Sequence, residues 1–149
     1  MIKDLEKYGQ RERVIEELSR CDWRGGQSLA KRLQGNTLVE KCGKHVVYVM
    51  LDENDETMAV CVLGEKDEID TKLTPWLGYV YTFPAFRGKR TMGKLITHVC
   101  RILKEQHIKD LYVSSNEHGL YEKYGFSYFA DMKTTKGETT TVYHRRINE

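Results

Sequence analysis

Apolar residues recur along this 149-residue chain at two spacings, which divide it into helical and extended segments. Intervals of three and four residues predict three amphipathic helices, over residues 12–21, 27–33 and 91–106. The pair Gly25–Gly26 is expected to break the chain between the first two helices. A shorter helix is predicted over residues 117–124, closed by Gly125. Residues 1–8 fit either a short strand or the lead into a helix.

Runs of β-branched and aromatic residues predict strands between these helices. They lie at residues 45–51, 57–63, 79–83, 110–114, 126–132 and 139–147. Short polar turns join the first two strands and the last two, which predicts two antiparallel hairpins. The middle strands flank the long helix, and such a strand–helix–strand unit pairs its strands in parallel. The sequence therefore predicts one α/β domain over residues 1–149, with a mixed sheet and helices on both faces.

Composition narrows the partners and the location that we expect. The formal net charge is only +2, so the chain as a whole does not require a nucleic-acid partner. No apolar run is long enough for a membrane-spanning helix, and the first residues lack the apolar core of a signal peptide. We therefore expect a cytoplasmic protein without a membrane partner. No CxxC pair occurs among the cysteines, so we expect no metal site; they are Cys21, Cys42, Cys61 and Cys100.

A basic, glycine-containing turn stands between the strand at 79–83 and the long helix. Pro84 removes a backbone donor and ends the strand, and the turn follows at residues 87–90, Arg-Gly-Lys-Arg. A helix N-terminus offers unpaired N–H groups and a partial positive charge. The arrangement predicts a site for a phosphate or pyrophosphate, and its alternative is a solvated turn that begins a helix.

Two stretches resemble sequence signatures of the GNAT superfamily of acyl-CoA-dependent N-acyltransferases. Residues 77–90 are similar to the family's fourth strand and pyrophosphate loop, and residues 119–126 to its Leu-Tyr-x-x-x-Gly-Phe signature. Arg87 fits the first position of the loop pattern Q/R-x-x-G-x-G/A, whereas Arg90 and Met92 stand where small residues are usual. The resemblance implies a GNAT-like fold, with a twisted, mostly antiparallel sheet of about six to seven strands and about four flanking helices.

The resemblance also implies acetyl-CoA as the co-substrate and assigns much of its site. The edge of Val80, Tyr81 and Thr82 would pair with the pantetheine arm. The loop and the helix start would bind the pyrophosphate, through Arg87, Gly88, Lys89, Arg90, Thr91, Met92 and Gly93. Asn116 corresponds to a cofactor-binding asparagine. Tyr121 would be the general acid that protonates the departing thiolate, and its alternative is a tyrosine of the core.

The residues that deprotonate and bind the amine are less well defined. Residues 76–77 and 111–112, where relatives often place a carboxylate, contain none. The acidic loop after the third strand offers Glu65 as a base or water-relay candidate, beside Asp67 and Glu68. Trp76 and Tyr79 are candidates for the acceptor pocket, with aromatic packing in the sheet as the alternative.

We therefore expect an N-acetyltransferase that moves an acetyl group from acetyl-CoA to a primary amine of a small molecule or peptide, by direct attack. Two other classes remain open: a non-catalytic acyl-CoA-binding sensor, and a nucleic-acid binder that uses the basic residues of the long helix. The balanced charge disfavours the nucleic-acid binder. The last strand, at 139–147, is either the edge of a homodimer or an edge that its charged end protects from pairing.

Overall fold

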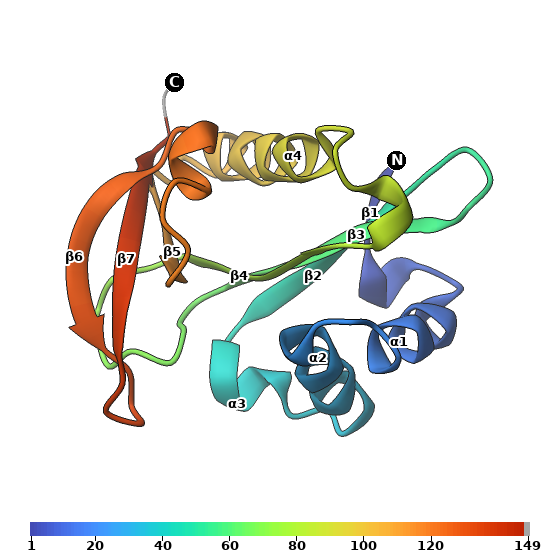
Figure 1. The fold of residues 1–149 in the computed structure, drawn as a ribbon, viewed down its shortest axis with the longest axis horizontal. Helices are drawn as coiled ribbons and strands as arrows, with labels where there is room; N and C mark the ends of the chain where they lie inside the picture. The colour runs from blue at the N-terminus through green and yellow to red at the C-terminus, as the bar shows by residue number, and fades with distance from the viewer. Residues whose placement is uncertain (148–149) are drawn as a thin grey trace.

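The computed structural model describes residues 1–147 and shows a seven-stranded sheet with helices on both faces (Figure 1). The strands are β1 (Ile2–Asp4), β2 (His45–Leu51), β3 (Thr57–Gly64), β4 (Trp76–Thr82), β5 (Asp110–Ser115), β6 (Ser127–Lys133) and β7 (Thr139–Arg146). The α-helices are α1 (Arg11–Ser19), α2 (Arg24–Gln34), α3 (Leu38–Cys42) and α4 (Thr91–Glu105). Short 3₁₀ helices are η1 (Leu5–Lys7), η2 (Pro84–Phe86) and η3 (Tyr121–Tyr124).

The order of strands in the sheet is β1-β2-β3-β4-β5-β7-β6. Neighbouring strands pair antiparallel except β4 and β5, which flank α4 in the chain and pair in parallel. The strands β5–β7 run at a steep angle to β2–β4 in Figure 1. The predicted mixed sheet and both hairpins are confirmed, as are the expected numbers of about seven strands and four flanking helices.

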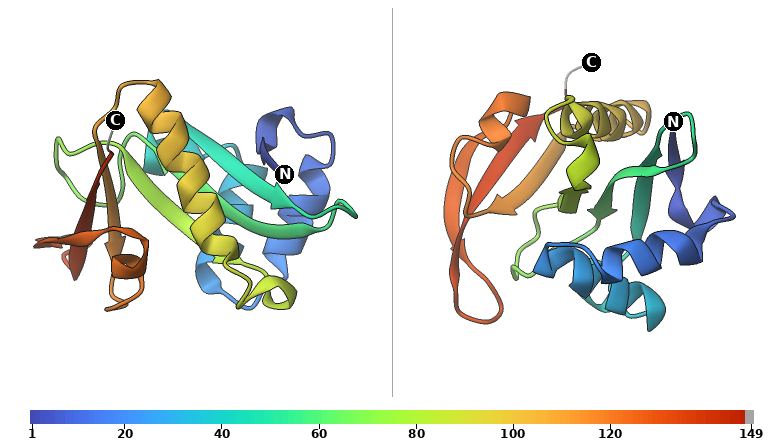
Figure 2. Two further views of the ribbon diagram at one scale, coloured as in Figure 1. Left: turned by 90° about the horizontal axis from the view of Figure 1, so that it is seen from above. Right: turned by 45° about the vertical axis from the view of Figure 1, so that its right-hand side comes forward.

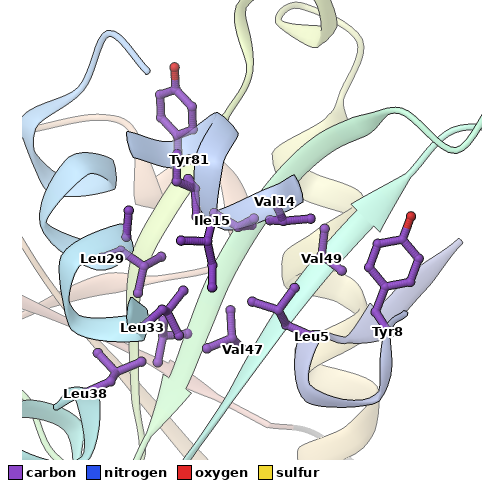
Figure 3. Close-up of a cluster of buried hydrophobic side chains, with 14 of the residues drawn as sticks. Leu5, Tyr8, Val14, Ile15, Leu29, Leu33, Leu38, Val47, Val49 and Tyr81 are labelled. Carbon is purple, nitrogen blue, oxygen red and sulfur yellow. The ribbon is translucent and has the colours of Figure 1, made fainter. Parts of the chain in front are cut away.

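Two buried apolar clusters lie on opposite faces of β2–β4. On one face α1, α2 and α3 contribute leucines and isoleucine that pack on Val47 and Val49 of β2 (Figure 3). On the other face, α4 packs on the alternate residues Tyr48 and Met50, and Figure 2 shows it crossing the strands. The two-residue alternation of a strand explains why adjacent residues of β2 serve different clusters.

The start of α2 corrects the predicted break at the glycine pair. Gly25 and Gly26 lie inside the first turn of α2 rather than between helices. A Cβ at Gly25 would stand 2.4 Å from the Trp23 ring, and one at Gly26 would stand 2.5 Å from Cys21 Sγ. The glycines therefore allow the preceding loop to fold closely against the helix, which outweighs their poor helix propensity.

Two further expectations are also corrected, and one helix lies outside those predicted. The region 117–124 forms only the 3₁₀ turn η3, because a turn at residues 118–120 precedes it. The short helix α3 was not predicted. The last strand, β7, lies between β5 and β6, so β6 rather than β7 forms the edge of the sheet at that end. Within residues 1–147, no helix is long and apolar enough to cross a membrane.

Candidate functional site

The sheet opens between β4 and β5. The two strands pair at only two positions, Trp76 with Tyr112 and Leu77 with Val113. Beyond them, the strands border a cavity of about 640 Å³ that contains the predicted strand edge, Val80, Tyr81 and Thr82. A strand that lacks a neighbour presents backbone groups that an extended ligand can pair with.

A β-bulge lies in β4 at this opening. Val60 pairs with Tyr81 and Val62 with Gly78, so β4 holds one residue more than β3 over this stretch. Tyr79 takes a left-handed backbone conformation at the bulge, with φ of 50°. Leu77 consequently faces the α4 cluster, whereas Tyr81 faces the cluster under α1 and α2. The bulge turns the backbone of β4 where the sheet opens.

The basic turn ends at α4, as the sequence predicted. Gly88 and Arg90 both have positive φ, of 77° and 61°, and Arg90 is the N-cap of α4. Among the described residues, no group accepts a hydrogen bond from the N–H groups of residues 88–93. The turn is exposed at Gly88, Lys89 and Arg90. Free N–H groups at the positive end of a helix dipole form an anion site.

Arg87 forms a salt bridge with Asp22 of the α1–α2 loop, a residue that the sequence analysis did not predict to belong to the site. Its guanidinium lies 3.1 Å from Asp22 Oδ1, and its Nε donates to the Thr82 carbonyl at 3.0 Å. The Tyr81 hydroxyl also donates to Asp22. Trp23 stacks on the Tyr81 ring, with centroids 5.7 Å apart. No periodicity or motif marks Asp22, because its role depends on a contact 65 residues away in the chain.

Asp22, Tyr81 and Arg87 stabilise one another's protonation states. The Tyr81 hydrogen bond and the Arg87 guanidinium hold the pKa of Asp22 below its usual range. Burial and the hydrogen bond to Asp22 raise the pKa of Tyr81 to about 12. At neutral pH the cluster therefore consists of a neutral phenol, a carboxylate and a guanidinium.

Tyr121, in η3, also lines the cavity of about 640 Å³ that contains the edge of β4. Its side chain is 7% exposed, and its ring packs against Phe126 and Tyr143. Burial raises the pKa of the Tyr121 phenol, so it stays protonated at neutral pH. Asn116 and Met92 line the same cavity, which brings the predicted residues of two separate motifs together.

A second cavity, of about 240 Å³, adjoins the first at the bulge. Trp23, Gly78, Tyr79 and Ser114 line both. Trp76 contributes to the smaller cavity, and its indole donates to the Leu73 carbonyl at 2.7 Å. The Tyr79 hydroxyl is buried and has no hydrogen-bond partner among the described residues.

The carboxylates of the acidic loop after β3 do not all face the cavities. Glu65 lines neither cavity: it packs over Gly43, and its Oε1 accepts from the Lys44 N–H at 3.3 Å. Asp67 and Glu68 line the smaller cavity, where Glu68 lies 3.1 Å from Lys41 Nζ. Burial raises the pKa of the Asp67 carboxyl.

Similarity to known proteins identifies a family for this fold. Residues 43–128 match the family described as "Acetyltransferase (GNAT) domain". No curated protein matches the sequence significantly.

Several solved structures share the fold over nearly the whole chain. A protein from Desulfovibrio desulfuricans described as an acetyltransferase of the GNAT family has a TM-score of 0.74 and 14% identity, with 99% of each chain covered. An aminoglycoside 6'-N-acetyltransferase complexed with coenzyme A has a TM-score of 0.71 and 10% identity, covering 100% of this chain and 98% of that one. The ribosomal-protein-S18-alanine N-acetyltransferase from Escherichia coli has a TM-score of 0.67 and 12% identity, covering 100% and 94%.

Proposed function

Because the chain belongs to the GNAT family of acetyltransferases, we propose that it transfers an acetyl group from acetyl-CoA to a primary amine of a small molecule or peptide. The observation that carries this proposal is the meeting of two cavities at the β4 bulge. The larger one runs along an open strand edge beside an anion-binding turn, which suits a thioester arm. The smaller one approaches the same point from the other side, which suits the amine.

The residues at the larger cavity fit coenzyme A. The N–H groups of residues 88–93 have no acceptor among the described residues, and a pyrophosphate supplies acceptors. Arg87 is held by Asp22 and Thr82, so we assign it the shaping of the turn. Lys89 and Arg90 have no ion pair within residues 1–147, which leaves their charges for the phosphates. Bound acetyl-CoA supplies an acetyl group activated as a thioester.

Tyr121 serves as the general acid in this proposal. The amine nitrogen bonds to the acetyl carbon, the carbon–sulfur bond breaks, and the departing sulfur takes a proton from the Tyr121 hydroxyl. Because burial raises the pKa of Tyr121, the phenol holds its proton before the reaction begins. The phenol then regains a proton from solvent.

Asp67 replaces Glu65 as our candidate for removing the amine proton. Glu65 points to Lys44, whereas Asp67 lines the smaller cavity. The raised pKa of Asp67 makes it a better proton acceptor than an exposed carboxylate. A water between Asp67 and the amine completes the path.

The experiment that tests this proposal measures thiol release from acetyl-CoA over a panel of polyamines, amino acids, aminoglycosides and peptides. We expect release that requires an amine, and a fall in kcat of about 100-fold in Tyr121→Phe with coenzyme A binding retained. Tyr128→Phe is the matched control, because Tyr128 is exposed on β6.

Two outcomes would overturn parts of the proposal separately. Thiol release that no amine stimulates would overturn the acetyltransferase activity on these acceptors. An unchanged kcat in Tyr121→Phe would remove Tyr121 from the proton path while leaving the activity in place.

A further inference from the structure

The two cavities meet at a junction that four residues border from both sides. They are Trp23, Gly78, Tyr79 and Ser114. Under the proposed function, on which this inference rests, the thioester enters the junction from the larger cavity and the amine from the smaller one. The acyl group lies at the junction when the amine nitrogen bonds to its carbon. These four residues therefore bound the space that an acyl chain can fill.

Trp23 has the largest side chain of the four. Gly78 has none, and the Ser114 hydroxyl lies 2.7 Å from Thr140 Oγ1, within hydrogen-bond distance. Trp23 is 38% exposed although it packs on the protein, and it lines both cavities. A chain that extends beyond the two carbons of an acetyl group consequently meets the indole ring.

The ring of Trp23 is held by contacts within the protein. It stacks on the Tyr81 ring with an interplanar angle of 9° and centroids 5.7 Å apart. It also lies so close to Gly25 that a Cβ there would stand 2.4 Å from it. Tyr81 is itself buried and packs edge-on against Phe83, with centroids 4.9 Å apart. The wall that Trp23 forms is thus backed by fixed groups.

Asp22, the residue before Trp23, fixes the α1–α2 loop to the end of β4. Its carboxylate accepts from the Tyr81 hydroxyl and from two guanidinium nitrogens of Arg87, at 3.1 and 3.3 Å. Paired guanidinium–carboxylate bonds impose a defined geometry. Both charged side chains are about half exposed, so the pair contributes little to stability and its main effect is on the position of the loop.

We propose that Trp23 limits the length of the acyl chain that this protein transfers, and that Asp22 is a positioning residue that holds Trp23 at the junction. The reaction is the same for every acyl group. The amine nitrogen bonds to the acyl carbon and loses a proton to water, the carbon–sulfur bond breaks, and the sulfur takes the Tyr121 proton. Only the space beyond the acyl carbon differs, and one methylene too many in a fitted pocket changes specificity by about 10–200-fold.

Thioether analogues test the chain-length limit without any acceptor amine. S-ethyl- and S-butyl-coenzyme A match acetyl and butyryl groups in chain length and cannot transfer them. By calorimetry, we expect the wild type to bind S-butyl-coenzyme A at least about tenfold more weakly than the S-ethyl form, and Trp23→Ala to reduce this preference to less than about threefold. Tyr128→Ala is the control, because Tyr128 is an exposed aromatic residue that lines neither cavity.

Two variants of Asp22 test its positioning role. Asp22→Ala should reduce the preference at least about threefold, whereas Asp22→Asn keeps an oxygen for the Tyr81 hydroxyl and should reduce it less. The ratio of kcat/KM for acetyl- over butyryl-coenzyme A, with the most active amine of the panel, should follow the same order. A merely structural role would weaken both thioethers by one factor and leave the preference unchanged.

Each result decides the question. Equal binding of the two thioethers by the wild type overturns the proposal, and so does an unchanged preference in Trp23→Ala. If that variant does not fold, Trp23→Leu decides by the same measurement, because leucine retains an apolar contact with Tyr81. An unchanged preference in Asp22→Ala overturns the positioning role alone. Chain-length selection without amine-dependent thiol release overturns the proposed transfer and leaves the limit set by Trp23 in place.

Discussion

Arg90 adopts a backbone conformation that favours glycine, at the N-cap of α4. Its φ of 61° costs an L-residue about 1 kcal/mol. We predict that Arg90→Gly is more stable than Arg90→Ala by about 1 kcal/mol, because both variants lose the guanidinium and only glycine relieves the backbone. Urea unfolding of the two variants measures the difference. An alanine variant of equal stability would contradict the strain.

The hydroxyl of Tyr79 is buried without a partner at the junction of the two cavities. We predict that Tyr79→Phe raises the free energy of unfolding by about 1 kcal/mol, because an unsatisfied buried hydroxyl is removed. Under the proposed function we also predict a fall in kcat/KM of about tenfold, because the variant has no hydroxyl to hydrogen-bond the substrate. The ring contact with Lys41 Nζ, at 4.5 Å, stays in place. Lower stability in thermal unfolding would show that the hydroxyl has a partner in the free protein.

At the scale of elements, the bulged strand β4 places a glycine at the junction of the two cavities. Gly78 lines both cavities, and a Cβ there would meet no atom within 4 Å. We predict that Gly78→Ala changes the unfolding free energy by less than about 0.5 kcal/mol. Under the proposed function it lowers kcat/KM at least about tenfold, because the methyl group would stand where the thioester and the amine meet.

Gly9→Ala is the control for this prediction, since Gly9 also has open space around its Cα and lines neither cavity. Equal activity of the two variants would show that the acetyl group does not pass Gly78.

The sequence predicts the elements of this fold better than the details of the site. The helix α4 is recovered because its buried residues repeat at helical spacing. The strand β2 is recovered because its continuous β-branched run favours a strand. The five-residue α3 contains too few turns for a period to show. The bulge at Tyr79 and the contact of Asp22 with Arg87 arise only when distant strands and loops meet, so no local pattern marks them.

At the scale of the whole molecule, stability at high pH depends on buried phenols. The pKa of Tyr81 rises from 10.0 to about 12 on folding. Below pH 10 the phenol is protonated in both states, and its stabilising contribution is fully present. Between pH 10 and 12 only the unfolded chain loses the proton, so the unfolding free energy falls.

We predict that this fall, between pH 9 and pH 11, is smaller by about 1 kcal/mol in Tyr81→Phe than in the wild type. Urea unfolding at the two pH values measures it, and Tyr128→Phe should retain the wild-type slope because Tyr128 is exposed. The same slope in Tyr81→Phe would mean that Tyr81 ionises equally in both states.

The short ladder between β4 and β5 has a consequence for turnover. With only two paired positions, the backbone of residues 78–82 pairs with β3 on one side but lacks a neighbour on the β5 side in the free protein. Under the proposed function the thioester arm becomes a temporary strand, and the departure of coenzyme A removes that strand again. The sheet is thus completed and reopened once in every catalytic cycle, and amide hydrogen exchange in β4 should slow when the cofactor binds.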